Sequence, residues 1–363
     1  MRVAIRVDAS AQIGTGHVMR CITLAGRLRK RGQEVCFFCR HLSQPLEKII
    51  REQGYSVIRL RQRPTGTGLK GTAHADWLGV SQECDADDFL DAIARWPAQW
   101  VVVDHYGIDQ KWEEKVGYAN RYILVIDDLA DRRHRCDVLL DQNFYLNMTS
   151  RYEDKVPGGC RLLLGPAYAL LREEFQSRRG KVFPKTSDAR RAFIFFGGVD
   201  KDNITSLALE AFAVLTKSQS LYADVVIGAA HPFRNEVVYA CARLGFDLHI
   251  QTDRMAELME RADFAIGGGG SSVWERCVFG LPTLVVIMAA NQRQLAHDLD
   301  VRGVVQNLGP ASCLSKTNLV DATIALVRDQ PRRLAMSRNS LALMTGNSED
   351  DVSDIMVNWN AET

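Results

Sequence analysis

Short apolar runs alternate with helical patterns through the first half of the chain. The runs Arg2–Asp8 and Glu34–Cys39 predict strands, and the segment from about His17 to Arg31 between them carries apolar residues at helical spacing. Further strands are predicted at Val57–Leu60, Val101–Asp104, Ile123–Asp127 and Val138–Asp141. Short continuous apolar strands that end in acidic residues are typical of a buried parallel sheet, so this half is expected to be an open α/β domain.

The same pattern restarts after Gly165-Pro166 and the polar stretch Arg178–Arg190. The strands expected in the second half are Ala192–Gly198, Ala223–Ala229, Asp263–Gly270 and Thr283–Met288. The predicted fold class is therefore α/β, with two doubly wound Rossmann-like domains. Because ligands of such sheets bind beyond the carboxyl ends of the strands, the two domains are expected to face a cleft that holds the active site. The expected boundaries are 1–165, 166–345 and a terminal segment, 346–363, that packs back on the first domain.

Composition and charge narrow the function classes. With 363 residues, 46% hydrophobic and 25% charged, the chain has the balance of a soluble two-domain enzyme. The 45 Lys and Arg nearly match the 44 Asp and Glu and form no long basic stripe, which argues against a nucleic-acid partner. The chain starts with a strand rather than a signal peptide, and its longest apolar runs are too short to span a membrane. A cytoplasmic protein without stable membrane association is expected.

Cysteine usage agrees with a reducing compartment. The nine cysteines are scattered and odd in number. The close pair Cys36 and Cys39 lies in a predicted strand, where an offset of three places the two side chains on opposite faces. Core packing is therefore expected for this pair, rather than a metal or redox role.

A histidine follows a glycine-rich turn near the amino terminus. Gly14 and Gly16 allow tight backbone geometry and close approach of a ligand, and the helix that begins there directs free N–H groups and positive potential at the ligand. That potential favours a neutral His17 ring, the form that a general base needs. The alternative is a histidine that caps its helix or bonds a neighbouring strand. A nicotinamide site is not expected, because Met19 stands where the dinucleotide fingerprint requires a third glycine.

A second glycine-rich loop lies in the other half. Gly267–Gly270 follow a predicted strand and precede Ser271 and Ser272 at the start of a predicted helix. Backbone N–H groups bared by glycine can hold a diphosphate, and Glu275 could accept hydrogen bonds from ribose. The alternative is a turn that serves packing alone. Weaker candidates at strand ends are Gly198, Asn291 and Gln292, while Asp200 or Asp202 is expected to cap a helix.

A divalent metal site is the alternative for Asp127 and Asp128. No partner at the spacing of a closed cage accompanies them, and helix capping or an ion pair with Arg132 is the commoner use. No metal and no cofactor is expected.

These residues together resemble a known family. The motifs are Arg6-x-Asp8-x-Ser10, Ile13-Gly14-x-Gly16-His17-x-Met19-Arg20-Cys21, Ile126-Asp127-Asp128, Gly165-Pro166-x-Tyr168-x-Leu170-Leu171-Arg172-x-Glu174-Phe175, Gly267 to Glu275 and Ala290-Asn291-Gln292. They are collinear, cover almost the whole chain, and are similar to PseG, the UDP-2,4-diacetamido-2,4,6-trideoxy-β-L-altropyranose hydrolases of pseudaminic acid biosynthesis. The glycine-rich loop is shared with MurG-like glycosyltransferases of the same GT-B architecture.

The resemblance implies hydrolysis of a UDP-sugar. His17 would activate water for attack at the anomeric carbon, UDP would lie on the carboxyl-terminal domain, and the sugar would face the amino-terminal domain. Flagellin glycosylation or surface polysaccharide synthesis would be the wider role. The implied substrate contacts are Asp8, Gly14, Gly16, Arg20, Tyr106, Tyr168, Arg172, Gly198, Gly269, Gly270, Ser271, Glu275, Asn291 and Gln292. A polar segment, Arg63 to Ala73, is a local elaboration without an assigned role.

Two other functions stay open. A MurG-like transferase would pass the sugar to an acceptor, and an exposed apolar patch with basic flanks would favour it if the acceptor were a lipid. A non-catalytic nucleotide-sugar binding protein would keep the glycine-rich loops and tolerate the loss of His17. Binding without turnover would identify it.

Overall fold

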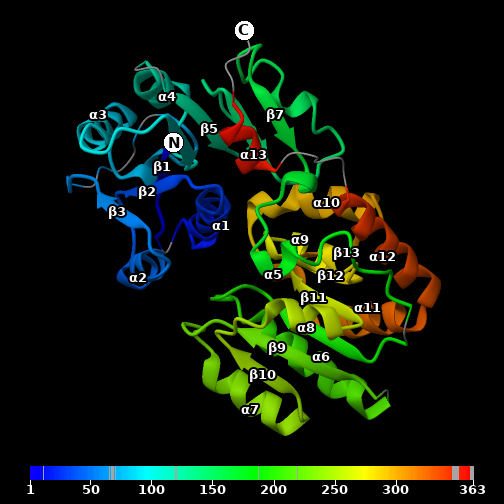
Figure 1. Ribbon diagram of the computed structural model, residues 1–363. Coiled ribbons are helices and arrows are strands. Elements are labelled where there is room, and N and C mark those ends of the chain that lie inside the picture. Colours follow the sequence, from blue (N-terminus) through cyan, green and yellow to red (C-terminus); the bar gives the residue numbers. More distant parts are fainter. Residues whose placement is uncertain are drawn as a thin grey trace. The chain divides into compact units, whose positions relative to one another are not determined.

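The chain folds into two compact units (Figure 1). The computed structural model describes residues 1–10, 12–64, 66, 69, 71–118, 121–186, 188–218, 220–345 and 351–359. Unit 1 comprises the described residues within 1–143, 147–170 and 348–363, and unit 2 those within 144–146 and 171–347. The chain thus passes to unit 2 after residue 170, and the short segment 144–146 also groups with unit 2.

Unit 1 is built on a parallel sheet. Its described strands are all parallel and run in the order β3-β2-β1-β4-β5-β6-β7. This is the doubly wound arrangement: β2 and β3 are added on one side of β1, and β4 to β7 on its other side. The carboxyl ends of β1 and β4 therefore lie side by side. The bounds are β1 Arg2–Val7, β2 Glu34–Cys39, β3 Ser56–Arg59, β4 Trp100–Asp104, β5 Tyr122–Ile126, β6 Val138–Asp141 and β7 Arg161–Leu164.

Two apolar layers cover the faces of this sheet. Cys39 belongs to the layer that includes α1, and Cys36 to the layer that includes α3 and α4, so the prediction of opposite faces is confirmed. Ser81 accepts a hydrogen bond from the Cys84 N–H and thereby starts α3, and Asp109 does the same for α4 through Lys111. The helices are α1 Gly16–Lys30, α2 Gln44–Glu52, α3 Gln82–Ile93, α4 Gln110–Gly117 and α13 Val352–Val357, with short 3-10 turns η1 Ala75–Leu78, η2 Ser150–Tyr152 and η3 Pro166–Tyr168.

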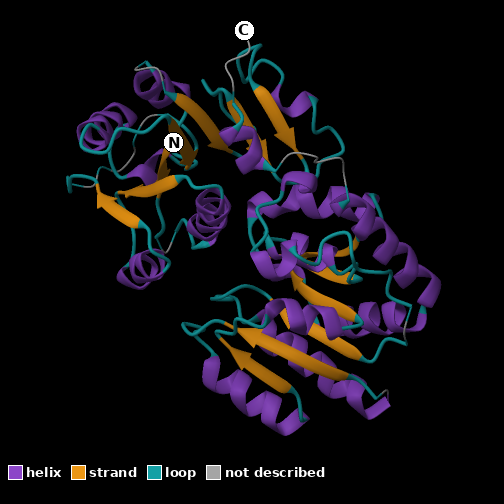
Figure 2. Ribbon diagram, in the orientation of Figure 1, coloured by secondary structure: helices purple, strands orange, loops and turns teal. Residues whose placement is uncertain are grey.

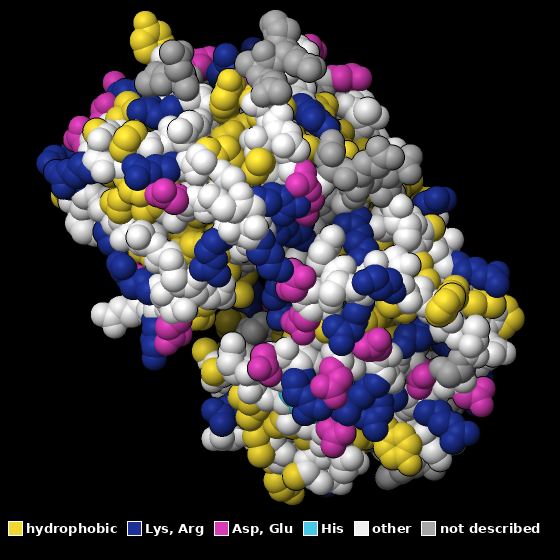
Figure 3. All heavy atoms as spheres, viewed as in Figure 1, with side chains coloured by type: hydrophobic (Ala, Val, Ile, Leu, Met, Phe, Trp, Pro, Cys, Tyr) yellow, Lys and Arg dark blue, Asp and Glu magenta, His cyan; other side chains and the backbone are white. Residues whose placement is uncertain are grey.

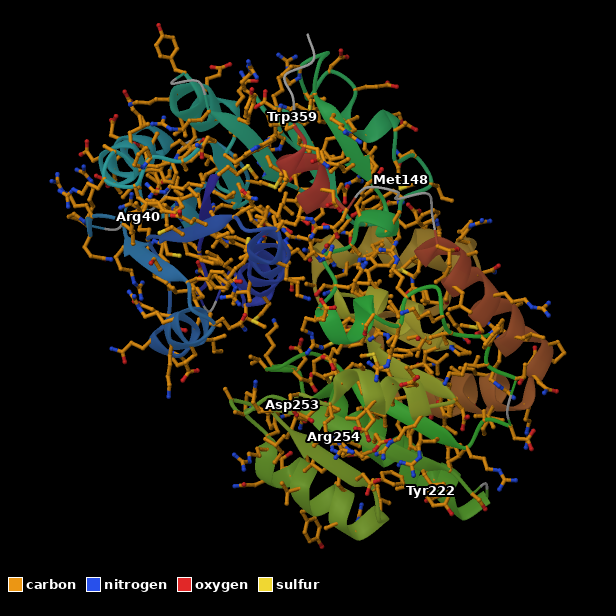
Figure 4. The ribbon with its side chains drawn as sticks, viewed as in Figure 1. Arg40, Met148, Tyr222, Asp253, Arg254 and Trp359 are labelled. Carbon is orange, nitrogen blue, oxygen red and sulfur yellow. The ribbon has the colours of Figure 1, made fainter. Side chains whose placement is uncertain are left out.

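The carboxyl-terminal segment completes unit 1. Arg27 of α1 bonds Asp351, and Arg31, which follows α1, bonds Asp354, each at 2.5 Å. Trp359, labelled in Figure 4, lies edge-on to Trp100 with 5.6 Å between ring centroids. Helix α13 is therefore fixed to α1 by ion pairs and to the sheet by an aromatic contact.

Unit 2 repeats the doubly wound plan with a smaller sheet. Its described strands are all parallel in the order β10-β9-β8-β11-β12-β13. The strands are β8 Arg191–Phe195, β9 Tyr222–Ile227, β10 Asp247–Ile250, β11 Phe264–Gly268, β12 Thr283–Ile287 and β13 Val305–Pro310. Figure 2 shows them flanked by helices α5 Glu173–Gln176, α6 Ile204–Ser218, α7 Arg234–Leu244, α8 Met255–Arg261, α9 Ser272–Val278, α10 Arg293–Val301, α11 Lys316–Arg328 and α12 Gln330–Met344, with 3-10 turns η4 Ala290–Gln292 and η5 Ala311–Cys313.

The surface of both units carries charges of both signs. On the face drawn in Figure 3, lysine and arginine side chains are interspersed with aspartate and glutamate in both units. Among the helices that the structure describes, none combines the length and hydropathy needed to cross a bilayer. Of the polar segment 63–73, residues 65, 67, 68 and 70 lie outside the described residues, as do 346–350 and 360–363 of the expected terminal segment.

Candidate functional site

The turn between β1 and α1 presents His17 at the carboxyl edge of the sheet of unit 1. Gly14 has φ of +78°, a conformation that glycine adopts without strain, and its N–H donates to the Ser10 carbonyl at 2.8 Å. Gly16 has no such requirement, since an added Cβ would meet nothing within 4 Å. The Thr15 side chain forms no capping hydrogen bond with the first turn of α1, the turn in which His17 lies.

His17 pairs with a carboxylate that the topology brings to it. Asp104 ends β4, next to β1, and its Oδ1 lies 2.5 Å from His17 Nδ1. Because a carboxylate only accepts, we assign the proton of the neutral ring to Nδ1, which leaves the lone pair of Nε2 for a substrate or water. The ring is 8% exposed and Asp104 1%. The pair has the arrangement of a general base and the residue that orients it.

Arg20 holds the carboxylate of this pair. Its Nε donates to Asp104 Oδ2 at 2.7 Å and its Nη2 to Oδ1 at 2.6 Å. Burial alone would raise the pKa of Asp104, but the charge of Arg20 and the hydrogen bonds from Arg20 and His17 bring that pKa well below its usual range. Arg20 Nη2 also lies 3.2 Å from His17 Nδ1, but both are donors in the assigned tautomer, so this contact is not a hydrogen bond.

Tyr106 and Asp128 extend the cluster. The Tyr106 ring meets the His17 ring edge-on, with 4.6 Å between centroids, and its hydroxyl donates to Asp128. Asp128 also accepts from Arg20 Nη1 at 3.3 Å. Burial, followed by the charge of Asp128, raises the pKa of Tyr106, so the phenol stays protonated. The sequence-predicted residues His17, Arg20 and Tyr106 thus lie together in unit 1.

Asp127 turns away from this cluster. Its Oδ1 pairs with Arg132 Nη1 at 2.8 Å, so the ion pair that the sequence favoured over a metal role is confirmed. In the described part of the chain, no three His, Cys, Asp or Glu side chains converge as metal ligands would.

Asp8, expected from the sequence to contact substrate, is buried in this structure. It has no exposed surface, and its carboxylate accepts from Arg6 at 2.7 and 2.9 Å and from the Arg40 N–H at 2.7 Å. Burial alone would raise its pKa, but Arg6 and His105 bring it below the usual range. Asp8 thus belongs to the framework at the end of β1, and its contact with substrate stays a prediction.

The glycine-rich loop of unit 2 lies beside a predicted amide. Gly267 and Gly268 belong to β11, so the loop proper is Gly269, Gly270 and Ser271, shorter than the sequence suggested. A Cβ on Gly269 would come within 3.4 Å of Gln292 Oε1, and one on Gly270 within 3.5 Å of Gln292 Nε2. Gln292 Oε1 accepts from the Met288 N–H at 3.0 Å, which fixes the end of β12 against this loop. Asn291 is exposed next to it.

The loop after β8 lies next along the same sheet edge. Gly228 could not carry a side chain, because its Cβ would come within 2.2 Å of the Gly198 carbonyl oxygen. Asp200 accepts from the backbone N–H of Ile204 at 3.1 Å and of Thr205 at 2.7 Å. The predicted helix cap is therefore confirmed for Asp200.

Glu275 and Arg172 were predicted separately and meet in unit 2. Arg172 Nε and Nη2 donate to Glu275 Oε1 at 3.2 and 3.1 Å, and Arg172 Nη1 pairs with Glu174 at 2.6 Å. Burial raises the pKa of Glu275, although Arg172 opposes the shift. Tyr168 lies in unit 1, packed against its core.

Sequence reasoning missed Asp104. The available signal was its place as the acid that ends the Val101–Asp104 strand, and what sequence could not supply was the partner 87 positions away. The resulting pair is the central feature of the site in unit 1.

The chain has the GT-B fold, with a histidine–carboxylate pair in one doubly wound α/β unit and a glycine-rich loop in the other. The fold class predicted from the sequence is confirmed by a solved structure, MurG of Acinetobacter baumannii, which is 13% identical with a TM-score of 0.61 and matches over 95% of this chain and 94% of that one. The cleft expected from sequence stays a prediction.

Comparison with protein families and curated proteins is more specific. Residues 192–355 match the family model of the glycosyltransferase family 28 C-terminal domain. The UDP-2,4-diacetamido-2,4,6-trideoxy-beta-L-altropyranose hydrolase of Campylobacter jejuni is 27% identical over 84% of this chain and 97% of its own, so the resemblance to PseG is confirmed. An uncharacterized protein of Methanocaldococcus jannaschii is 24% identical over 82% of this chain, which spans 58% of that longer relative.

Proposed function

We propose that this protein hydrolyses a UDP-sugar, with UDP-2,4-diacetamido-2,4,6-trideoxy-β-L-altropyranose as its substrate, to UDP and the free sugar. The observation that carries the proposal is the 2.5 Å contact between His17 and Asp104, which orients the imidazole with Nε2 free to act as a base. The similarity to the Campylobacter hydrolase supports the choice of substrate. We extend the proposal from that relative to pseudaminic acid biosynthesis in the cytoplasm.

The water-activating half of the reaction is assigned to unit 1. Nε2 of His17 takes a proton from water as the water oxygen bonds to the anomeric carbon. Asp104 keeps Nδ1 protonated and stabilises the imidazolium that forms, while Arg20 fixes the carboxylate in place. The bond between the anomeric carbon and the diphosphate oxygen breaks, and its electron pair leaves with UDP. Tyr106 positions the His17 ring through their edge-on contact.

The nucleotide half is assigned to unit 2. Backbone N–H groups of Gly269, Gly270 and Ser271 would hold the departing diphosphate, because charge develops on it as the bond breaks. Glu275 would accept from ribose through Oε2, since Oε1 already accepts from Arg172. Contacts from Gly198, Asn291 and Gln292 at the same sheet edge, and from Tyr168 of unit 1, complete the proposed set. No step requires a metal.

A glycosyltransferase is the second candidate. The match of residues 192–355 to the family 28 C-terminal domain and the fold shared with MurG favour it. In that reaction His17 would take its proton from an acceptor hydroxyl instead of water. A binding protein without turnover would use the loop of unit 2 and leave the His17–Asp104 pair without a role.

The test is an assay without any acceptor. The protein is incubated with a panel of UDP-diacetamido-trideoxy sugars, and UDP and reducing sugar are measured together. Hydrolysis releases the two in equal amounts with wild-type protein and not with the His17→Phe control. Release of UDP only after an acceptor is added would establish the transferase, and UDP-sugar binding without release would establish the binding protein.

A further inference from the structure

A buried arginine lies beneath the glycine-rich loop of unit 2. Arg276, in α9, is 1% exposed, and its guanidinium donates to the Gly268 carbonyl at 2.7 Å and to the Ser272 hydroxyl at 3.2 Å. Its Nε is buried without a hydrogen-bond partner among the described residues. The guanidinium therefore braces both ends of the loop and retains an unused donor.

Among the ion pairs found within 4.0 Å in the described part of the chain, none involves Arg276, and Glu275 acts on its charge without bonding it. Glu275, its neighbour in sequence, bonds Arg172 instead. Burial lowers the pKa of Arg276 to about 10, so the group remains charged at neutral pH. A buried charge without a partner is unfavourable, and an anion on the loop would offset that cost.

Gly267 shows how closely the arginine is fitted to the loop. A Cβ there would lie 2.7 Å from Arg276 Nη1 and 2.5 Å from the Phe195 carbonyl oxygen. A side chain at Gly267 would thus displace the guanidinium or separate β11 from β8. The first glycine of the run makes room for a cation rather than for a ligand.

We propose that Arg276 is a positioning residue that makes the loop Gly269–Ser271 selective for the diphosphate of a nucleotide over an uncharged nucleoside. It acts across the loop backbone and does not touch the ligand. The proposal rests on the function proposed above and names the group that selects its leaving diphosphate. The loop amides supply contacts and Arg276 supplies a fixed positive charge, whereas the charge of the buried Arg6 in unit 1 is paired with Asp8 and Asp85.

The experiment compares UDP, uridine and inorganic pyrophosphate as ligands of the full chain. Arg276→Met should weaken UDP and pyrophosphate binding roughly tenfold or more, from the loss of one charge at low effective dielectric, and leave uridine binding within twofold. Arg276→Lys keeps the charge and should keep most of the preference for UDP. The matched control is Arg333→Met, because Arg333 is also a buried arginine of unit 2 but bonds the carbonyls of Leu326 and Val327 at the end of α11.

The outcomes separate this inference from the proposed function. Equal weakening of UDP and uridine by Arg276→Met would mean that the arginine only braces the loop, and unchanged UDP binding would also overturn the inference while leaving the hydrolase proposal intact. If circular dichroism shows that the Met variant does not fold, the Lys variant decides. Loss of the preference for UDP over uridine in Arg276→Lys, which keeps the charge, would contradict the proposal. Failure of the wild-type protein to bind UDP would overturn both proposals.

Discussion

The two sheet edges use buried charge in opposite ways. In unit 1, Arg6 bonds Asp8 at 2.7 Å and Asp85 at 2.9 Å, and Arg40, labelled in Figure 4, bonds the same Asp85 at 2.9 Å. In unit 2, the corresponding edge is glycine backbone with Arg276 beneath it, bonded to neutral oxygens. The buried arginines at the edge of unit 1 are paired with carboxylates, whereas Arg276 in unit 2 is bonded only to neutral oxygens of the described residues and its charge can act on a ligand.

This difference suggests how one topology can serve two tasks. A base needs a fixed neighbourhood, and the paired charges of unit 1 fix the end of β1, next to the Asp104 end of β4 and just before the helix that carries His17. A nucleotide site needs exposed N–H groups and uncompensated positive potential, which a loop of glycines over a lone guanidinium supplies. The comparison therefore predicts catalytic loss from changes in unit 1 and binding loss from changes in unit 2.

Replacement of the proposed base should have the largest effect. His17→Phe is expected to lower turnover on the order of 100- to 10,000-fold, because general-base catalysis is lost, and to leave UDP affinity unchanged. Steady-state kinetics and UDP titration of the same preparation test this. Turnover within about threefold of wild type, a change under roughly 1 kcal/mol, would give His17 a structural role.

The paired charges of unit 1 should matter next, and for stability. Asp85→Ala leaves Arg6 and Arg40 without their shared carboxylate and is expected to lower the free energy of unfolding by about 3–5 kcal/mol. Asp87→Ala, in the same helix but exposed, should cost less than about 0.5 kcal/mol. Tryptophan fluorescence in urea reports on unit 1, which contains every tryptophan except Trp274. Equal effects of the two variants would contradict the account.

Asp104→Asn should have an intermediate effect on turnover. It keeps the size of the side chain but removes the charge that stabilises the imidazolium, so a loss of roughly 100-fold is expected with little change in KM. A change in KM alone would indicate that Asp104 shapes substrate binding rather than the base.

The pH dependence of unit 1 offers a smaller effect. Burial, followed by the charge of Asp128, raises the pKa of Asp141 to about 8. Between about pH 4 and pH 8 the folded state holds a proton on Asp141 that the unfolded state has released. The contribution of Asp141 to the free energy of unfolding is therefore fully present below about pH 4 and is lost as the pH rises to about 8. The free energy of unfolding of Asp141→Asn, measured in urea, should therefore rise by about 1–2 kcal/mol relative to that of the wild type between pH 5 and pH 8. The same difference at both pH values would contradict the prediction.

Chelation should have the smallest effect of all. If the loop amides hold the diphosphate and the charge of Arg276 favours it from behind the loop, excess EDTA is expected to leave turnover unchanged. Loss of activity that magnesium or manganese restores would return Asp127 and Asp128 to consideration as ligands.

Much of this could be predicted from the sequence, and the omissions have physical reasons. Strands buried on both faces, such as β4, appear as continuous apolar runs, whereas β10 and β13 are only partly buried and lack that signal. Glycine at Gly14 and the acid at Asp104 are local signals. The pairing of His17 with Asp104, and the bonding of Glu275 to Arg172 rather than to Arg276, depend on residues that only the folded sheets bring together.

The central claim is attack of water at the anomeric carbon, and oxygen-18 tests it most directly. The reaction is run in enriched water, and the UDP and the sugar are analysed by mass spectrometry, with a no-enzyme control because free sugars exchange their anomeric oxygen with solvent. Attack at the anomeric carbon leaves the released UDP unlabelled and puts the label in the new hydroxyl of the sugar. Label in the terminal phosphate of UDP would show that water attacks phosphorus, and the role assigned to His17 would be wrong.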